Sequence, residues 1–378
     1  MEWIPRSIES RFASIVQKGK VLVLYGARRV GKTSVADKFL KSLDRKIFAG
    51  TGDDIDLRSI LSSENKTIIS TSFKGYEVVF IDEAQRIPNI GRGLKLLVDS
   101  NPEISVIASG SSSFELLNKV GEPLTGRQIL YTLYPVSMME LADFKGRLHV
   151  KQNLADYLIY GTYPETINAT NYDNKRESLI TLRNSYLFKD ILEVESIRNS
   201  DKMFELLKLI AFQIGNEVSL NELSGSLGIA KQTVERYLSL LEKSFIIFKV
   251  GGYSSNLRKE ITRTSRYYFW DNGVRNALIN NFNDPSTRMD VGMLWENLCF
   301  VERVKKQAYK KLYSNNYFWR TYDRQEVDMI EDRDGKLFGF EFKWNPRKKI
   351  KPPKAFIESY NNARFECITP DNFLEFVL

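Results

Sequence analysis

The stretch from Gly26 to Thr33 has the residue types and spacing of a phosphate-binding loop. It reads GARRVGKT, which fits G-x-x-x-x-G-K-[ST], and it lies between a short apolar strand and a helix. Gly26 and Gly31 allow backbone N–H groups to curl around a β-phosphate, and the helix N-terminus adds partial positive charge. Lys32 is expected to reach the β and γ oxygens, and Thr33 to hold magnesium. The alternative is a glycine turn with an unrelated lysine.

We therefore expect ATP and Mg²⁺ as ligands. The predicted nucleotide contacts are consecutive: Gly26, Ala27, Arg28, Arg29, Val30, Gly31, Lys32, Thr33 and Ser34.

Two carboxylates follow a second apolar strand. In VVFIDEAQ, Asp82 and Glu83 come where the carboxyl edge of a parallel sheet would meet the phosphate loop. Asp82 is expected to orient Mg²⁺, and Glu83 to orient or deprotonate the attacking water. An acidic pair at a helix N-terminus is the alternative. The next strand ends in ASGSSS, where Ser109 or Ser111 could bond the γ-phosphate or the water, or could simply cap the helix near Phe114.

A second group of carboxylates lies near the C-terminus. Asp328 is on one expected strand and Glu341 on the next, while Glu296 is on the preceding long helix. Glu341 and Lys343 are two residues apart, so they share one face of an extended strand. Asp328 and Glu341 could hold Mg²⁺, assisted by Glu296 or Glu326, while Lys343 stabilises a hydroxide that attacks phosphorus. A solvated strand face explains the same residues without chemistry.

Two basic segments favour an anionic partner such as DNA. One expected helix, after the turn at Gly228, carries side chains that could reach bases or phosphates: Lys231, Gln232, Thr233 and Arg236. A basic run follows the carboxylates: Lys343, Arg347, Lys348, Lys349, Lys351 and Lys354. Such a run also suits a solvated loop, and such a helix can also bind protein.

The elements that must position these residues form a succession of domains. Apolar runs at 21–25, 46–49, 77–81 and 104–108 alternate with helical stretches, which predicts an α/β core with a parallel sheet over residues 1–136. Residues 137–200 read as a helical lid. Residues 201–270 read as three helices and a hairpin with its tip at 251–256, the order of a winged helix-turn-helix. Residues 271–378 are expected to form a further α/β domain.

Composition sets outer limits on function. The chain has 378 residues, of which 43% are hydrophobic and 27% charged, with a formal net charge of +8. The single histidine, His149, makes a histidine-based triad or metal site improbable, and the two cysteines lack zinc spacing. No apolar stretch is long enough to cross a membrane, so we expect a soluble, cytoplasmic protein without a membrane partner.

The ordered motifs resemble a known family. GARRVGKTS, VVFIDEAQ, ASGSSSFELL, LTGRQILYTLYPVSMMEL, GTYPE, YYFWDNG and EVDMI followed by FEFKW are similar to the predicted AAA+-superfamily ATPases of bacteria and archaea that carry a C-terminal domain of unknown function. The resemblance covers nearly the whole chain. It implies an ATPase core, a helical and winged-helix middle, and a C-terminal domain similar to PD-(D/E)xK nucleases, whose restriction-endonuclease-like fold can also persist in inactive descendants.

The resemblance also implies arginines that act on nucleotide. Arg127 lies where AAA+ proteins place an arginine finger that reaches the γ-phosphate of a neighbouring subunit, which would require a homo-oligomer. The alternative is an arginine that stabilises the interface between sheet and lid. Arg183 in the lid is a second candidate for sensing nucleotide.

Two classes of function remain open at this stage. The first is an ATP-hydrolysing enzyme that processes nucleic acid through the winged helix and the nuclease-like domain. The second is a nucleotide-operated switch or scaffold that binds protein partners and cuts nothing.

Overall fold

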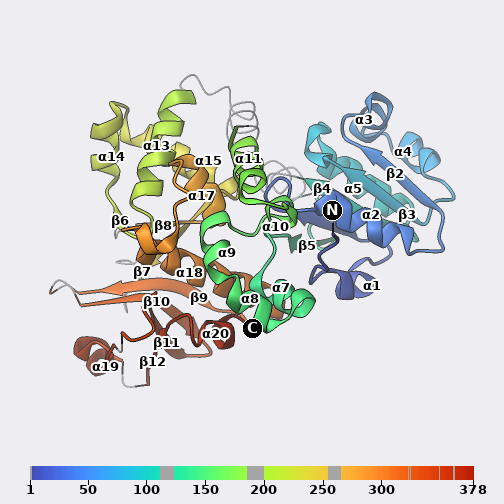
Figure 1. The fold of residues 1–378 in the computed structure, drawn as a ribbon. Coiled ribbons are helices and arrows are strands. Elements are labelled where there is room, and N and C mark those ends of the chain that lie inside the picture. The colour runs from blue at the N-terminus through green and yellow to red at the C-terminus, as the bar shows by residue number, and fades with distance from the viewer. Residues whose placement is uncertain are drawn as a thin grey trace. The chain divides into compact units, whose positions relative to one another are not determined.

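The structure is a computed structural model that describes residues 2–110, 123–184, 200–253, 265–321, 323, 325–348, 350–360 and 362–378. The described residues form two compact units (Figure 1). The core unit comprises Pro5–Pro135 and Lys243–Phe245. The C-terminal unit comprises Met1–Ile4, Val136–Glu242 and Ile246–Leu378.

The core unit is built on a five-stranded parallel sheet in the order β2-β3-β4-β1-β5. Its strands are β1 (Val21–Tyr25), β2 (Ile47–Thr51), β3 (Val78–Asp82), β4 (Ser105–Gly110) and β5 (Gln128–Thr132). β1 lies between β4 and β5, and β4 separates β1 from β3. The predicted parallel α/β core is therefore present, although β2, β3 and β4 each begin one residue later than predicted.

Apolar helix faces complete this core. Leu57, Leu61, Ile69 and Leu94 pack in one cluster with Val79 of the sheet. Burying such side chains is the main driving force for folding, at roughly 25 cal/mol per Å² of apolar surface. Asp54 and Asn65 cap two helices by accepting backbone N–H bonds. The helices of the core unit are η1 (Glu9–Arg11), α1 (Phe12–Ile15), α2 (Lys32–Lys41), α3 (Ile55–Ser62), α4 (Lys66–Ser72), η2 (Ala84–Arg86) and α5 (Ile90–Ser100).

From Val136 onward the C-terminal unit continues with a series of helices, within the segment 137–200 that was predicted as a helical lid. Ser137 starts the first of them with a capping box, in which its side chain and that of Glu140 bond each other's backbone N–H groups. These helices are α7 (Met138–Lys145), α8 (Arg147–Gln152), α9 (Leu154–Tyr160), α10 (Pro164–Asn168) and α11 (Tyr172–Leu182). The rest of the predicted lid, residues 185–199, lies outside the described residues.

Further helices follow, and α18 is the longest of those described. They are α13 (Ser200–Phe212), α14 (Leu220–Leu227), α15 (Lys231–Lys243), α17 (Asn272–Leu278), η4 (Pro285–Thr287), α18 (Val291–Lys310), α19 (Lys354–Ser359) and α20 (Phe373–Val377). The helix α15 contains the residues predicted to face DNA.

One mixed sheet of seven strands runs through this unit in the order β12-β11-β10-β9-β7-β8-β6 (Figure 1). Its strands are β6 (Glu217–Val218), β7 (Ile247–Gly252), β8 (Ser265–Phe269), β9 (Asn315–Arg320), β10 (Glu326–Arg333), β11 (Lys336–Phe342) and β12 (Arg364–Ile368). β7 pairs with β9 in parallel, through Gly251 with Tyr317 and Gly252 with Phe318. The segments 201–270 and 271–378, predicted as separate domains, thus share a continuous sheet. Without this pairing, β7 and β9 would each present an open strand edge. The pairing gives backbone groups on both strands a hydrogen-bond partner.

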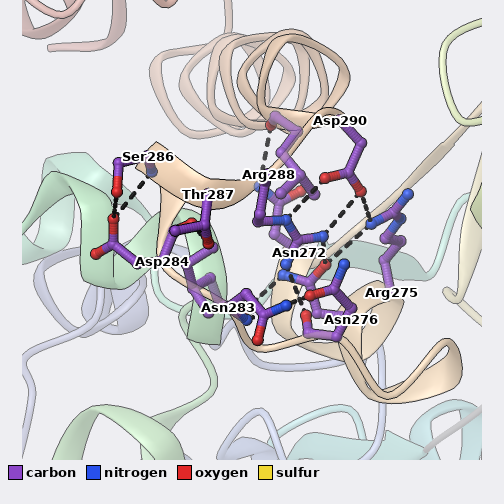
Figure 2. A network of polar contacts seen from close by, with 12 residues as sticks. Asn272, Arg275, Asn276, Asn283, Asp284, Ser286, Thr287, Arg288 and Asp290 are labelled. Atoms are coloured by element: carbon purple, nitrogen blue, oxygen red, sulfur yellow. Dashed lines mark hydrogen bonds and ion pairs between the residues drawn. The ribbon is translucent and has the colours of Figure 1, made fainter.

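Two buried arginines hold the segment that leads into α18 (Figure 2). Arg275 Nη1 lies 2.6 Å and Arg288 Nε 2.7 Å from the carboxylate oxygens of Asp290, the residue before α18. Arg275 Nε also donates to the carbonyl oxygen of Ala211 in α13. Burial raises the pKa of Asp290, but the two guanidinium groups lower it to about 2 overall. This network fixes the start of the helix that carries Glu296.

None of the helices in the described ranges is both long and apolar enough to span a bilayer. Several predicted features fall outside those ranges: Ser111, the helix near Phe114, the hairpin tip at 254–256 and Lys349.

Candidate functional site

The backbone of the predicted phosphate loop requires glycine at both expected positions. Gly26 has φ 145°, and a Cβ there would lie 2.1 Å from the carbonyl oxygen of Leu133. Gly31 has φ 96° and immediately precedes α2. Within the loop, Arg29 also has a positive φ, 58°. L-residues rarely adopt this conformation, so the loop is held in a special shape.

The side chains of the loop divide into buried and exposed groups. Ala27 and Val30 are buried, and Arg28 is half-buried. Thr33 and Ser34, in the first turn of α2, are exposed. The hydroxyl groups of Thr33 and Ser34 are thus accessible, while the apolar side chains anchor the loop.

Lys32 is buried at the N-terminus of α2. Its Nζ donates to the carbonyl oxygens of Gly26 at 3.0 Å and Ala27 at 2.8 Å, so the ammonium lies within the curl of the loop. Burial lowers its pKa to about 8, and the carboxylates of Glu83 and Asp82 partly offset that effect. A desolvated cation at this point is a strong binding group for an anion.

Thr33, Asp82 and Ser109 meet at the carboxyl edge of the sheet. Thr33 Oγ1 donates to Asp82 Oδ2 at 2.9 Å, and the buried Ser109 donates to Asp82 Oδ1. Since β4 lies between β1 and β3, Ser109 bridges the two strands that carry the site. Ser109, one of the two serines expected to bond the γ-phosphate or the attacking water, donates to Asp82 in this structure. The hydroxyl and the carboxylate are hard oxygen donors that fit Mg²⁺.

Glu83 follows Asp82 in a left-handed conformation, with φ 47°. Gln85 Nε2 donates to Glu83 Oε2, and Gln85 itself is only 4% exposed. A Cβ on Gly52 would lie 2.3 Å from the carbonyl oxygen of Glu83, so the backbone is closely packed there as well. Sequence reasoning missed the role of Gln85, although VVFIDEAQ contains it. It also missed Arg6, which bonds the phosphate loop from the N-terminal segment.

Arg127 lies at the edge of the sheet opposite to the phosphate loop. It directly precedes β5, which runs parallel to β1 with Val21 paired with Gln128, whereas the loop follows the other end of β1. With roughly 3.3 Å per residue, the length of β1 separates the two edges by about 15 Å. Arg127 forms an ion pair with Asp99. Arg127 is therefore distant from the phosphate loop of its own chain.

The second predicted nucleotide sensor, Arg183, bonds the carbonyl oxygen of Ala277 through Nη1 at 2.9 Å, within the C-terminal unit.

Asp328, Glu341 and Lys343 form a cluster in the C-terminal unit. Lys343 Nζ lies 2.6 Å from Glu341 Oε1 and 3.7 Å from Asp328 Oδ2. The backbone N–H of Phe342 donates to Asp328 Oδ2 at 2.8 Å. Burial and the nearby Asp328 raise the pKa of Glu341 to about 7. Burial alone would lower the pKa of Lys343, but the two carboxylates raise it overall.

Glu296 is close to this cluster but is bonded elsewhere. Tyr268 donates its hydroxyl to Glu296 Oε1 at 2.8 Å, and Arg266 Nη1 lies 3.7 Å from the same oxygen. Arg266 also pairs with Glu326 at 2.6 Å. Over the described ranges, no group of three Asp, Glu, His or Cys side chains could hold a metal ion. Glu296, expected to assist Asp328 and Glu341 in holding a metal ion, is engaged by Tyr268 and Arg266 in this structure.

The predicted nucleic-acid contacts are accessible where the structure describes them. On α15, Lys231, Gln232 and Arg236 are exposed and Thr233 is half-buried. The exposed members of the basic run are Arg347, Lys348, Lys351 and Lys354.

Three family models match segments of the chain. Residues 18–142 match the model of the AAA domain, and two models described as domains of unknown function match residues 151–285 and 291–370. The first match shows that residues 18–142, which hold the phosphate loop and the parallel sheet, are similar to the AAA domain.

Relatives match over most of their length. Uncharacterized protein MJ1544 of Methanocaldococcus jannaschii is 24% identical, over 93% of this chain and 85% of its own. Uncharacterized protein Rv2008c of Mycobacterium tuberculosis is 25% identical, over 97% of this chain and 80% of its own. A solved structure titled replication initiator DnaA bound to AMPPCP and single-stranded DNA is 14% identical, over 62% of this chain and 86% of its own, with a TM-score of 0.33.

Proposed function

We propose that the protein binds and hydrolyses ATP and uses the nucleotide to act on nucleic acid. The observation that carries the first part is the contact of Thr33 Oγ1 with Asp82 Oδ2 at 2.9 Å, beside a buried Lys32. The site therefore has, at one edge of the sheet, an ammonium group that could bind phosphate and oxygen atoms that could bind Mg²⁺.

Each residue has a distinct task in hydrolysis. Lys32 would exchange its contacts with the carbonyls of Gly26 and Ala27 for the β- and γ-phosphate oxygens. Thr33 and Asp82 would hold Mg²⁺, which when bound neutralises charge on these phosphates. Glu83, held by Gln85, would orient the attacking water and accept its proton.

Contacts with DNA are proposed for α15. Its exposed Lys231 and Arg236 can neutralise phosphates, and Gln232 can reach a base edge. Arg127 would reach the γ-phosphate of a second copy, which implies a homo-oligomer.

ATP turnover by the purified full chain tests this proposal. We expect phosphate release with Mg²⁺ and none with excess EDTA. The double variant Lys231→Ala with Arg236→Ala should keep the turnover measured without DNA. It should bind duplex DNA more weakly, with a salt dependence reduced by a slope of about 0.9 for each lost phosphate contact.

Lys151→Ala, on the exposed surface of α8, is the matched control for DNA binding. Absence of Mg²⁺-dependent turnover would refute the ATPase. Unchanged DNA binding by the double variant would refute the role of α15.

A second candidate activity is cleavage of a phosphodiester bond at the Asp328 cluster. It is favoured by Glu341 Oε2, which is buried and has no hydrogen-bond partner among the described residues. Divalent metals are often held by one or two carboxylates together with substrate phosphates, so Asp328 and Glu341 fit such an ion. Lys343, which contacts both, would stabilise the attacking hydroxide.

Cleavage of plasmid, linear and single-stranded DNA with Mg²⁺ or Mn²⁺ tests this second activity. Asp328→Asn retains an acceptor for the N–H of Phe342, and it should lower cleavage at least about a hundredfold, as should Lys343→Ala, because residues that act as a unit are not additive. Lys336→Ala, exposed at the start of β11, should have no effect. If the parent cleaves no DNA or RNA with either metal, with and without ATP, the nuclease interpretation is wrong. The C-terminal unit would then act as part of a switch or scaffold that binds protein partners.

A further inference from the structure

Arg6 connects the phosphate loop, which follows β1, to the segment that follows the neighbouring strand β5. Its side chain is 5% exposed. Nη1 donates to the carbonyl oxygen of Val30 at 2.6 Å, and Nη2 donates to the carbonyl oxygen of Tyr134 at 2.6 Å. Val30 lies inside the loop, and Tyr134 follows β5, so one guanidinium joins two segments that are distant in sequence.

The bond to Val30 sets the orientation of one peptide group of the loop. In a planar trans peptide, the carbonyl and the following N–H point in opposite directions. While Arg6 holds the carbonyl oxygen of Val30, the N–H of Gly31 must point away from Arg6. Backbone N–H groups at this position in such a loop are the ones that bind phosphate.

An arginine suits this pair of bonds better than a lysine does. The guanidinium is planar and has two terminal nitrogens in a fixed fork, whereas a lysine ammonium is a single point on a flexible stem. The bonds come from a charged donor, and such bonds are shorter and stronger than neutral ones.

The N-terminal segment has separate anchors and does not need the guanidinium to stay attached. Glu9 accepts the backbone N–H of Arg6 at 2.6 Å and pairs with Lys38 of α2 at 2.8 Å. Phe12 is buried and stacks on Phe39 with ring centroids 4.3 Å apart. The two bonds of the Arg6 guanidinium are therefore not required to anchor the N-terminal segment, and they can serve the phosphate loop.

We propose that Arg6 is a positioning residue of the nucleotide site. It holds the Val30–Gly31 peptide with its N–H turned toward the bound phosphate, and it braces that peptide against the end of β5. The inference rests on the proposed binding of ATP. Because loop N–H groups contact phosphate in the ground state and the transition state alike, losing their alignment should raise KM and leave kcat nearly unchanged.

The variant Arg6→Lys in the full chain tests this, with Arg6→Gln as a second variant. Titration with a fluorescent ATP analogue gives both the dissociation constant and the number of binding sites. We expect Kd and KM to rise at least about tenfold while kcat changes less than about twofold. Glu9→Gln is the control: it weakens the pair with Lys38 but leaves the fork intact, so its Kd should match the parent.

A purely structural role would give a different result. Partial unfolding reduces the number of sites and the apparent kcat, with Kd unchanged, and that outcome would overturn the proposal. Failure of both Arg6 variants to fold, while Glu9→Gln folds, would overturn it too. If the parent itself does not bind the ATP analogue, the proposed function fails first, and the two failures are thereby distinguished.

Discussion

Lys32→Ala should abolish tight ATP binding, with a dissociation constant raised at least about a hundredfold, because hydrogen bonds to charged groups contribute roughly 1.5–3 kcal/mol each and Lys32 would make two or more. The measurement is calorimetric or fluorescence titration with Mg²⁺ and ATP. Lys41→Ala, exposed at the end of the same helix, is the control for helix and charge effects.

The fold itself should tolerate this change. Burial lowers the pKa of Lys32 to about 8, so burying the charged ammonium opposes folding, while its bonds to the carbonyl oxygens of Gly26 and Ala27 favour the fold. Removing it should leave the melting temperature near that of the parent, and a loss of binding can then be assigned to the site. A variant that binds and hydrolyses ATP like the parent would refute the phosphate-loop interpretation.

The nucleotide site was the most predictable part of the molecule because its geometry is local. Gly26, Gly31 and Lys32 lie within one short segment that runs from the end of a buried strand into a helix. The parallel strands bring Asp82 to the same edge of the sheet. Arg6 could not be found in this way. Its two acceptors are 24 and 128 residues away, and no periodic pattern links them.

The C-terminal cluster was predictable only in part. Strand alternation places Glu341 and Lys343 on one face, and the structure has them 2.6 Å apart. The surroundings of Glu296 depend on Tyr268 and Arg266, which belong to a strand that was assigned to another domain. Pairing of β7 with β9 joins these segments, and strand pairing between distant segments leaves no local signal in the sequence.

Glu83→Gln should leave ATP binding close to that of the parent, within about threefold, and slow turnover at least about a hundredfold, since general-base catalysis contributes typically 10²–10⁴. The substitution keeps the size of the side chain and an oxygen that can accept from Gln85, so the position is preserved and only the basicity is lost. Glu83 therefore separates the chemical step from binding.

Single-turnover phosphate release, measured beside the ATP dissociation constant, checks this prediction. Glu77→Gln is the matched control, because Glu77 is exposed just before the opposite end of β3, where Glu77 Oε2 accepts the backbone N–H of Lys46 at 3.1 Å. A Glu83→Gln variant with weak binding but parental turnover of the bound ATP would show that Glu83 holds the nucleotide ligand instead of activating water. The general base would then be a residue other than Glu83. It would not be Asp82 either, because the carboxylate of Asp82 already accepts from Thr33 and Ser109.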